Sequence, residues 1–202
     1  MGAPRGVASA YIFDFDGTLG TIPVDWEKVK GGLREATGSQ EEFKSVFPTI
    51  VRVLKENPKV RRRVFALIDE YEEEAAPRAV LYPGSFDLLK ALAETAKISL
   101  VTMQGPKAAA TVLQRLDLKQ FFVRIFSRED SLDRAEQVRL ALEAMRVKKE
   151  STIFVGDRLN DLSAARRVGV PFTMIRTHGR DPEEGDIPLY HSVAEFFETI
   201  RS

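Results

Sequence analysis

The amino-acid sequence predicts an α/β fold: a doubly wound, Rossmann-like parallel sheet with helices on both faces and an inserted small α-helical cap. Two observations predict it. Short apolar segments alternate with segments of helical spacing along most of the chain, and residues 21–82 show helical spacing without a strand-like segment. Short strands that alternate with helices are typical of a parallel sheet covered on both faces. In such sheets, ligands bind beyond the carboxyl ends of the strands.

Five short apolar segments are the predicted strands, and each is bounded by polar or turn residues. They are "AYIF" ending at Phe13, "ISLV" ending at Val101, "FFVRIF" ending at Phe126, "TIFV" ending at Val155 and "PFTMI" ending at Ile175. Between the later strands, apolar residues recur at helical spacing and predict helices that pack on the sheet. These residues are Leu88, Leu89 and Leu92; Val112, Leu113 and Leu116; and Val138, Ala141, Leu142 and Met145.

Three helices are predicted in the stretch without strands. Asp25 can cap a helix that runs through Arg34, and the capping box "SQEE" at residues 39–42 predicts the start of a second helix. Pro48 is expected to end or kink that second helix. Asn57 followed by proline reads as the N-cap of a third helix.

These helices form a predicted insertion. The turn signal "YPG" closes the helical stretch, so we expect residues 21–82 to be the helical cap. Residues 1–20 and 83–202 would then form the α/β catalytic core.

Composition restricts the class of protein. Of 202 residues, 44% are hydrophobic and 30% are charged, with 30 basic and 30 acidic side chains and no cysteine. This composition fits a globular protein in a reducing compartment, without disulfides or thiolate metal sites, and gives no sign of nucleic-acid binding. No apolar run approaches a membrane span of about 18 residues. Because the start of the chain also lacks the apolar region of a signal peptide, we expect a cytoplasmic protein that binds no membrane. Its oligomeric state stays open.

Two carboxylates follow the first predicted strand directly. In "YIFDFDGTLG", residues 11–20, Asp14 and Asp16 lie two positions apart. Side chains two positions apart in a strand point the same way, roughly 7 Å from each other. At the mouth of an apolar strand the two charges repel and lose hydration. The pair therefore indicates a site where a cation compensates the charge.

A second acidic motif follows the strand that ends at Val155. The segment "VGDRLND" supplies Asp157 and, four residues later, Asp161. If both strands are central, four carboxylates converge at one edge of the sheet, where an oxygen-only site suits Mg²⁺. Thr102, after another strand, adds a hydroxyl group, and Arg134, at a helix start, adds a fixed positive charge. Acids, metal, hydroxyl group and cation are what phosphoryl transfer needs.

With these motifs the chain resembles the haloacid-dehalogenase-like phosphohydrolase superfamily over nearly its whole length. "DFDGTL" at Asp14–Leu19 is similar to the first motif of that superfamily, "SLVT" ending at Thr102 to the second, and "VGDRLND" to the acidic fourth. The helical insertion resembles the small cap of its phosphoglycolate-phosphatase-like members.

The resemblance implies a Mg²⁺-dependent phosphatase that hydrolyses a small phosphorylated metabolite, phosphoglycolate-like or a sugar phosphate, through an aspartyl-phosphate intermediate. Asp14 would attack phosphorus and bind the metal. Asp16 would protonate the leaving group, then activate water, and lend its backbone carbonyl to the metal. Because four carboxylates and a phosphate outnumber the positive charges of Mg²⁺ and one arginine, one carboxyl group should stay protonated, as the acid role of Asp16 requires.

The resemblance also implies the ligands. Thr102 and a basic residue would hold the phosphoryl oxygens, and Asp157 and Asp161 would complete the Mg²⁺ site. The superfamily usually places a lysine in its third motif, and this sequence has none there. Arg134, 23 residues before Asp157, and Arg128, 29 residues before it, can both replace the lysine; spacing and the helix start favour Arg134. Met103 stands where many relatives carry asparagine.

Other interpretations stay open. A phosphosugar mutase of the same fold would share every core motif, and a phospho-accepting receiver domain or a non-catalytic binding protein could use the same fold class. Arg61–Arg63 and Glu72–Glu74 are expected to be solvated faces of a helix. His178, after the last strand, is expected to be incidental.

Overall fold

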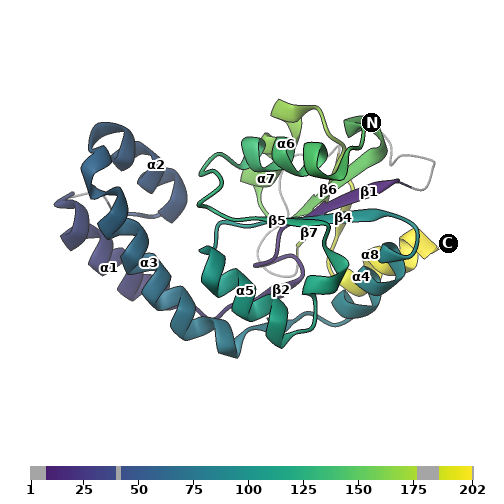
Figure 1. Ribbon diagram of the computed structural model, residues 1–202, viewed down its shortest axis with the longest axis horizontal. Coiled ribbons are helices and arrows are strands. Elements are labelled where there is room, and N and C mark those ends of the chain that lie inside the picture. The colour runs from purple at the N-terminus through teal and green to yellow at the C-terminus, as the bar shows by residue number, and fades with distance from the viewer. Residues whose placement is uncertain (1–7, 40–41, 177–186, 202) are drawn as a thin grey trace.

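The fold is a six-stranded parallel sheet with helices on both faces and three further helices at one end (Figure 1). The computed structural model describes residues 8–39, 42–176 and 187–201. The strands of the sheet are β1 (Ala10–Phe13), β4 (Lys97–Val101), β5 (Arg124–Phe126), β6 (Thr152–Gly156), β7 (Phe172–Ile175) and β8 (Leu189–Tyr190). Their order is β5-β4-β1-β6-β7-β8, and every neighbouring pair is parallel. The predicted doubly wound α/β fold is therefore confirmed.

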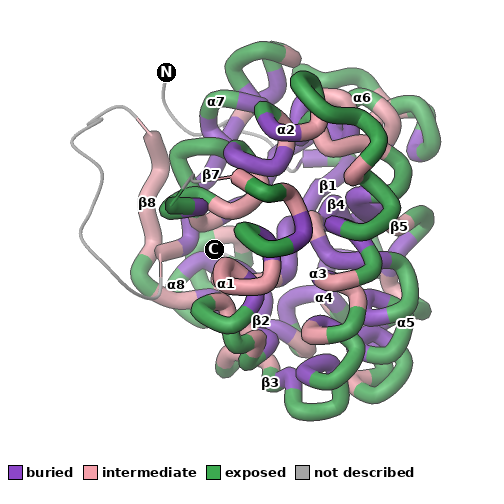
Figure 2. Tube along the Cα trace, turned by 90° about the vertical axis from the view of Figure 1, so that its left-hand side faces the viewer, coloured by how far each residue is buried: buried purple, intermediate pink, exposed green. Residues whose placement is uncertain are grey.

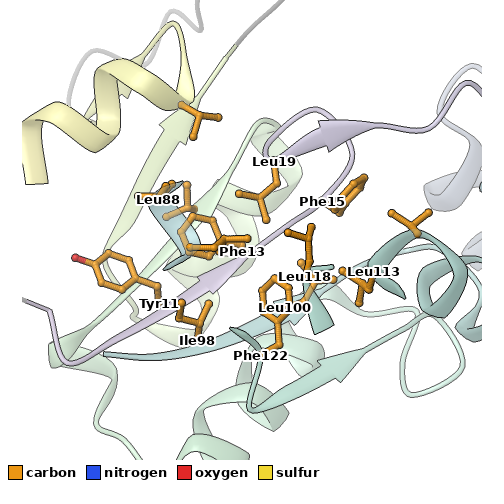
Figure 3. Close-up of a cluster of buried hydrophobic side chains, with 14 of the residues drawn as sticks. Tyr11, Phe13, Phe15, Leu19, Leu88, Ile98, Leu100, Leu113, Leu118 and Phe122 are labelled. Atoms are coloured by element: carbon orange, nitrogen blue, oxygen red, sulfur yellow. The ribbon is translucent and has the colours of Figure 1, made fainter. Parts of the chain in front are cut away.

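Alternation along the central strand creates the two layers of the core. Tyr11 and Phe13 face one cluster of buried side chains, and Ala10 and Ile12 face the other. Helices α4 (Ser85–Ala93), α5 (Pro106–Arg115) and α8 (Val193–Arg201) cover the first face. Helices α6 (Arg134–Met145) and α7 (Leu159–Val168) cover the second face. Figure 3 shows Phe13 in the first cluster, packed among side chains from α4, β4 and α5. Figure 2 shows the burial of β1 and β4, whose residues are nearly all buried.

All five predicted strands exist, and the third is shorter than predicted. Lys119–Phe121 forms a 3₁₀ turn, so only the last half of "FFVRIF" pairs with β4. Three strands of two residues each were not predicted. These are β8, at the edge of the sheet, and the antiparallel pair β2 (Gly20–Thr21) and β3 (Val80–Leu81), which joins the two chain segments that lead to and from the three extra helices.

The extra helices are α1 (Trp26–Thr37), α2 (Val46–Glu56) and α3 (Arg61–Ala75). Asp25 caps α1 as predicted, because its side chain accepts a hydrogen bond from the backbone N–H of Lys28. A 3₁₀ turn over Pro58–Val60 precedes α3. These helices share a hydrophobic cluster of their own, formed by Val29, Leu33, Phe43, Ile50, Val53, Val64, Phe65 and Ile68.

The predicted start of the second helix is wrong. Helix α2 begins at Val46, and Pro48 lies in its first turn, where the missing N–H has no intrahelical partner in any case, so the proline neither ends nor kinks the helix. Before it, Phe43 adopts a φ of 45° and is only 1% exposed. Burial of this ring turns the chain and outweighs the local capping signal. Residues 40 and 41 of the predicted capping box lie outside the described residues.

The C-terminal part of α3 packs on the α/β layers. Ala75, Ala76 and Ala79 belong to the cluster on the α4–α5 side of the sheet, although they lie inside the segment predicted to be the cap. Helix α5 contacts both α3 and the turn Ala76–Arg78 that follows it. The division into a cap of residues 21–82 and a core stays a prediction. Within the described residues, none of the helices has both the length and the apolar character that a bilayer span requires.

Candidate active site

The first acidic motif lies at the carboxyl end of β1. The backbone N–H of Asp14 still donates to the carbonyl of Val155 at 3.0 Å, so sheet pairing fixes its position beside β6. The residue is 5% exposed. The chain then turns, because three successive N–H groups, those of residues 18–20, donate to the carbonyl of Phe15. Asp16 is held by this turn, and its Oδ1 accepts a hydrogen bond from the N–H of Ile22 at 3.0 Å.

Gly17 is required by this turn. Its φ of +91° disfavours any residue with a side chain. A Cβ atom at this position would lie 2.3 Å from Oδ2 of Asp157. The turn after β1 therefore packs its backbone directly against the acidic loop after β6.

The second acidic motif closes the cluster. Asp157 follows β6, and Asp161 lies in the first turn of α7, where its Oδ2 accepts from the N–H of Arg158 at 3.2 Å. Asp14, Asp157 and Asp161 each bring one carboxylate oxygen within 4.8 Å of the others. Three of the four predicted carboxylates thus converge. The carboxylate of Asp16 is outside this group and interacts with the backbone of Ile22.

Burial and like charge oppose the ionisation of three carboxyl groups at the site. Burial raises the pKa of Asp157 to about 7, and the negative charge of Asp14 adds to the effect. Burial likewise raises the pKa of Asp161, against the opposing effect of Arg134. Burial is also the main cause that raises the pKa of Asp16, with a smaller contribution from Asp14.

The donor set fits a hard divalent cation. Oδ1 of Asp157 is buried and accepts no hydrogen bond within the described residues. Three oxygen donors from two adjacent loops, with open space on the side of the cleft, suit Mg²⁺, which keeps several water ligands and uses few carboxylates. A divalent cation among these oxygens would offset the burial and the like-charge repulsion that raise the pKa values of Asp157 and Asp161.

Thr102 lies beside the acids, at the end of β4. Its N–H donates to the carbonyl of Phe126 at 2.8 Å, and its hydroxyl oxygen accepts from the N–H of Gln104 at 3.2 Å. The residue is 1% exposed and lines the cleft together with Met103 and Gln104. The hydroxyl group therefore has a fixed position from which it can donate to an anion.

Arg134 provides the cation at the acidic cluster. Its Nη2 lies 3.3 Å from Oδ1 of Asp14, and its Nε lies 3.1 Å from Oδ1 of Asp161. Asp133 caps α6 through the N–H of Ala135 and so places the arginine in the first helical turn. Only 8% of the side chain is exposed. Of the two candidate arginines, the one favoured by spacing is the one at the acids; its catalytic role stays a prediction.

Arg128 lies elsewhere and is completely buried. Its guanidinium pairs with two carboxylates of α3: Nη1 lies 2.6 Å from Oε2 of Glu72, and Nη2 pairs with Asp69. The expectation that Glu72 is solvated is therefore wrong. Glu72 is 1% exposed because α3 turns this side of its C-terminal half toward the loops after β4 and β5.

Two further residues of the site were missed by sequence reasoning. Gln137, fully buried, accepts from Nη1 of Arg134 at 3.0 Å, and its amide donates to the carbonyls of Thr102 and Ser127. Its position three residues after Arg134 on one helix face was the available signal. Arg158 reaches over the acids from the N-terminus of α7, 3.5 Å from Asp157 and 3.9 Å from Asp16.

A cleft of about 1000 Å³ opens over these groups. Asp14, Asp16, Thr102, Arg134 and Asp161 line its floor. Its opposite wall comes from α1, α2 and the chain segment before α1. His178 lies outside the described residues.

Known proteins resemble this chain in sequence. Residues 11–175 match the family model described as "Haloacid dehalogenase-like hydrolase". Among curated relatives, phosphoglycolate phosphatase of Shigella boydii is 30% identical over 122 residues, which are 58% of this chain and 47% of the relative. The chain thus spans about half the length of the curated relatives it matches.

Solved structures share the fold at low sequence identity. The HAD phosphatase of Thermococcus onnurineus superposes with a TM-score of 0.69 at 21% identity, covering 95% of this chain and 97% of that one. The proposed HAD hydrolase YfnB of Bacillus subtilis, whose structure was determined with bound magnesium, gives a TM-score of 0.62 at 21% identity, covering 98% of this chain and 100% of that one.

Proposed function

The chain belongs to the haloacid dehalogenase-like hydrolase family, and we propose that it is a Mg²⁺-dependent phosphatase that hydrolyses a phosphate monoester through a covalent aspartyl-phosphate. One observation carries the proposal: Asp14 lies between two further carboxylates and the guanidinium of Arg134, at the floor of a cleft. A carboxylate in that position lies beside a cation and faces a space where a phosphoryl group fits.

Asp14 is the proposed nucleophile. One of its carboxylate oxygens forms a bond to phosphorus while the bond from phosphorus to the ester oxygen breaks. Arg134 and Thr102 stabilise the charge that develops on the phosphoryl oxygens. Mg²⁺, held by Asp14, Asp157 and Asp161 with help from the backbone carbonyl of Asp16, would supply further charge neutralisation.

Asp16 is the proposed acid and base. Burial raises its pKa, which favours the protonated form that must deliver a proton to the departing ester oxygen. The hydrogen bond from the N–H of Ile22 to Oδ1 keeps this carboxyl group oriented. In the second step, the carboxylate takes a proton from water, whose oxygen attacks phosphorus and releases Asp14 and inorganic phosphate.

Hydrolysis of 4-nitrophenyl phosphate with and without Mg²⁺ tests the proposal. The unaltered chain, Asp14→Asn and the surface control Asp87→Asn should be compared at equal concentration. We expect turnover that requires Mg²⁺, persists in Asp87→Asn and disappears in Asp14→Asn. Turnover that survives in Asp14→Asn, or that continues in the presence of a chelator, would overturn the mechanism. Phosphoglycolate is the first metabolite to assay, because a curated relative is named for its hydrolysis.

A further inference from the structure

The two walls of the cleft differ in chemistry. The floor, described above, carries the acids, Thr102 and Arg134. The facing wall is apolar and basic. Its apolar residues are Ile22, Val24, Trp26, Val46, Phe47, Pro48 and Val51, and its charged residues are Lys30, Lys44 and Lys55. Whatever part of a substrate points away from the phosphate must meet this wall.

The apolar part of the wall has a defined shape. The rings of Trp26 and Phe47 meet edge to face, with centroids 5.9 Å apart at an angle of 77°. Both residues are only partly buried and line the cleft. The two rings are nearly perpendicular, so each offers its own apolar surface to a ligand, and a flat group can stack on one ring while its edge meets the other. A purely polar substrate of two or three carbons would leave these ring surfaces in water.

The charged residues of the wall differ in position and in pairing. Phe47, Val51 and Lys55 follow at intervals of four residues, so one face of α2 leads from the aromatic surface to an ammonium group. Lys30 pairs with Glu27 at 2.7 Å, and Lys44 pairs with Glu42 at 2.8 Å. In the part of the chain that the structure describes, Lys55 forms no ion pair and no hydrogen bond.

The cleft-lining Glu72 of α3 offers Lys55 no free negative charge. Oε2 of Glu72 accepts from Arg128 at 2.6 Å and from the N–H of Gly105 at 2.8 Å, so its charge is already compensated. An anionic group in the upper part of the cleft would therefore meet a cation without a competing internal partner. A cleft of about 1000 Å³ also has room for a leaving group much larger than a two-carbon acid.

We propose that the substrate is a phosphate monoester whose leaving group carries a flat apolar part that packs on Trp26 and Phe47 and, at its far end, a second anionic group that pairs with Lys55. The inference rests on the proposed phosphatase function and narrows its substrate class. The expected substrates are aromatic or similarly flat phosphate esters with a distal carboxylate or phosphate. Phosphoglycolate and neutral sugar phosphates are expected to be poorer substrates.

A series of alkyl phosphates tests this specificity, because their leaving alcohols differ little in intrinsic reactivity. The substrates are ethyl phosphate, benzyl phosphate, 4-carboxybenzyl phosphate and 2-phosphoglycolate, assayed with Mg²⁺ by release of inorganic phosphate. We expect kcat/KM to rise at least tenfold from ethyl to benzyl phosphate and again, about threefold to tenfold, to 4-carboxybenzyl phosphate. A kcat/KM for ethyl phosphate or 2-phosphoglycolate that is higher than the value for 4-carboxybenzyl phosphate would overturn the inference.

Variants test whether the gain from the carboxylate depends on Lys55 and the gain from the aromatic ring on Trp26. Lys55→Gln should remove the advantage of 4-carboxybenzyl over benzyl phosphate. The control Lys59→Gln, at a residue that does not line the cleft, should keep that advantage and leave the turnover of benzyl phosphate unchanged. Trp26→Ala should remove the advantage of benzyl over ethyl phosphate. Retention of both advantages in these variants would contradict the assignment.

A binding experiment separates this inference from the proposed function. Calorimetry with benzylphosphonate and 4-carboxybenzylphosphonate, which cannot be hydrolysed as esters, reports on the wall without turnover. Tighter binding of the carboxylated compound, lost in Lys55→Gln, supports the inference even if no ester is hydrolysed, and the phosphatase proposal alone then fails. Equal binding of the two compounds, with turnover of ethyl phosphate intact, overturns the inference and leaves the phosphatase proposal standing.

Discussion

Arg128 and Glu72 form a buried ion pair, 2.6 Å from Nη1 to Oε2, that joins the loop after β5 to helix α3. Both residues are almost completely inaccessible to solvent. The same guanidinium nitrogen donates to the carbonyl of Met103 at 3.0 Å, and the same carboxylate oxygen accepts from the N–H of Gly105. The loop that carries Thr102 at its start is therefore tied to α3 through two charges.

Removal of one partner of this pair should be costly. Glu72→Ala leaves Arg128 buried with Asp69 as its remaining carboxylate, and we expect the free energy of unfolding to fall by about 3 kcal/mol. The double variant Glu72→Leu, Arg128→Met should recover a large part of that loss, because it leaves no buried charge unpaired. Urea denaturation measures both values, with the exposed Glu74→Ala as the control. A loss below about 1 kcal/mol in Glu72→Ala would show that the pair contributes little.

Arg134 should be replaceable only in part. Its guanidinium spans Asp14 and Asp161, which the single ammonium group of lysine cannot do in the same geometry. We expect kcat/KM on the assay ester to fall about 100-fold or more in Arg134→Gln, and less in Arg134→Lys, because the charge remains. Steady-state kinetics and inhibition by inorganic phosphate measure the effect, with Arg139→Gln on the exposed face of α6 as the control. Equal losses in the lysine and glutamine variants would exclude a role for the charge.

Gly17 and Gly31 should respond in opposite ways to alanine. Gly17→Ala forces a Cβ into the carboxylate of Asp157 at a φ of +91°, so we expect a loss of about 1–3 kcal/mol in stability and loss of turnover. Gly31 lies inside α1, and no atom would lie within 4 Å of a Cβ there. Gly31→Ala should stabilise the protein by up to about 1 kcal/mol and leave turnover unchanged. Wild-type turnover in Gly17→Ala would contradict the close packing of the two loops.

The acidic cluster should make the stability of the metal-free protein depend on pH. In the folded chain the pKa of Asp157 is raised to about 7 and that of Asp161 to about 6, whereas in the unfolded chain both titrate near 4. Between about pH 4 and pH 7 the folded state therefore binds more protons than the unfolded state, and stability falls as the pH rises.

Thermal unfolding can measure this dependence. The unfolding midpoint of the metal-free protein minus that of its Asp157→Asn variant should be larger at pH 5 than at pH 7.5. Addition of Mg²⁺ at pH 7.5 should raise the midpoint of the unaltered protein and have a smaller effect on the variant, with a shift of about 2–4 °C for each kcal/mol of binding. A pH-independent difference, or equal responses to Mg²⁺, would contradict a cation site at these carboxylates.

The sheet was predictable because its strands are buried on both faces. All four residues of β1 are buried, which produces an apolar run that few other structures explain. Strand β8 has only two residues, both half-buried, and so leaves no pattern in the sequence. The start of α2 was mispredicted because the burial of Phe43, a tertiary effect, outweighs a local capping signal.

The acids were predictable because parallel strands that are neighbours end at the same edge. β1 lies directly beside β6, so Asp14 and Asp157 had to be close. Glu72 was not predictable, because helical periodicity identifies the apolar stripe of α3 but does not say that a further element covers its polar side. That information exists only once the loop carrying Arg128 is packed against it.

The two halves of helix α3 pack against different parts of the molecule, and this has a consequence for how the cleft can change in evolution. The second half of α3 and the turn that follows it contribute ion pairs and alanines to the packing on the α/β layers, whereas the cleft-lining side chains of α1 and α2 take no part in that packing. The pair β2–β3 joins the chain segments that lead to and from these helices, so their ends are fixed independently of the side chains that α1 and α2 turn to the cleft. Exchange of the cleft-lining side chains of α1 and α2 could therefore alter which ligands the cleft accepts and leave the acids at the sheet edge in place.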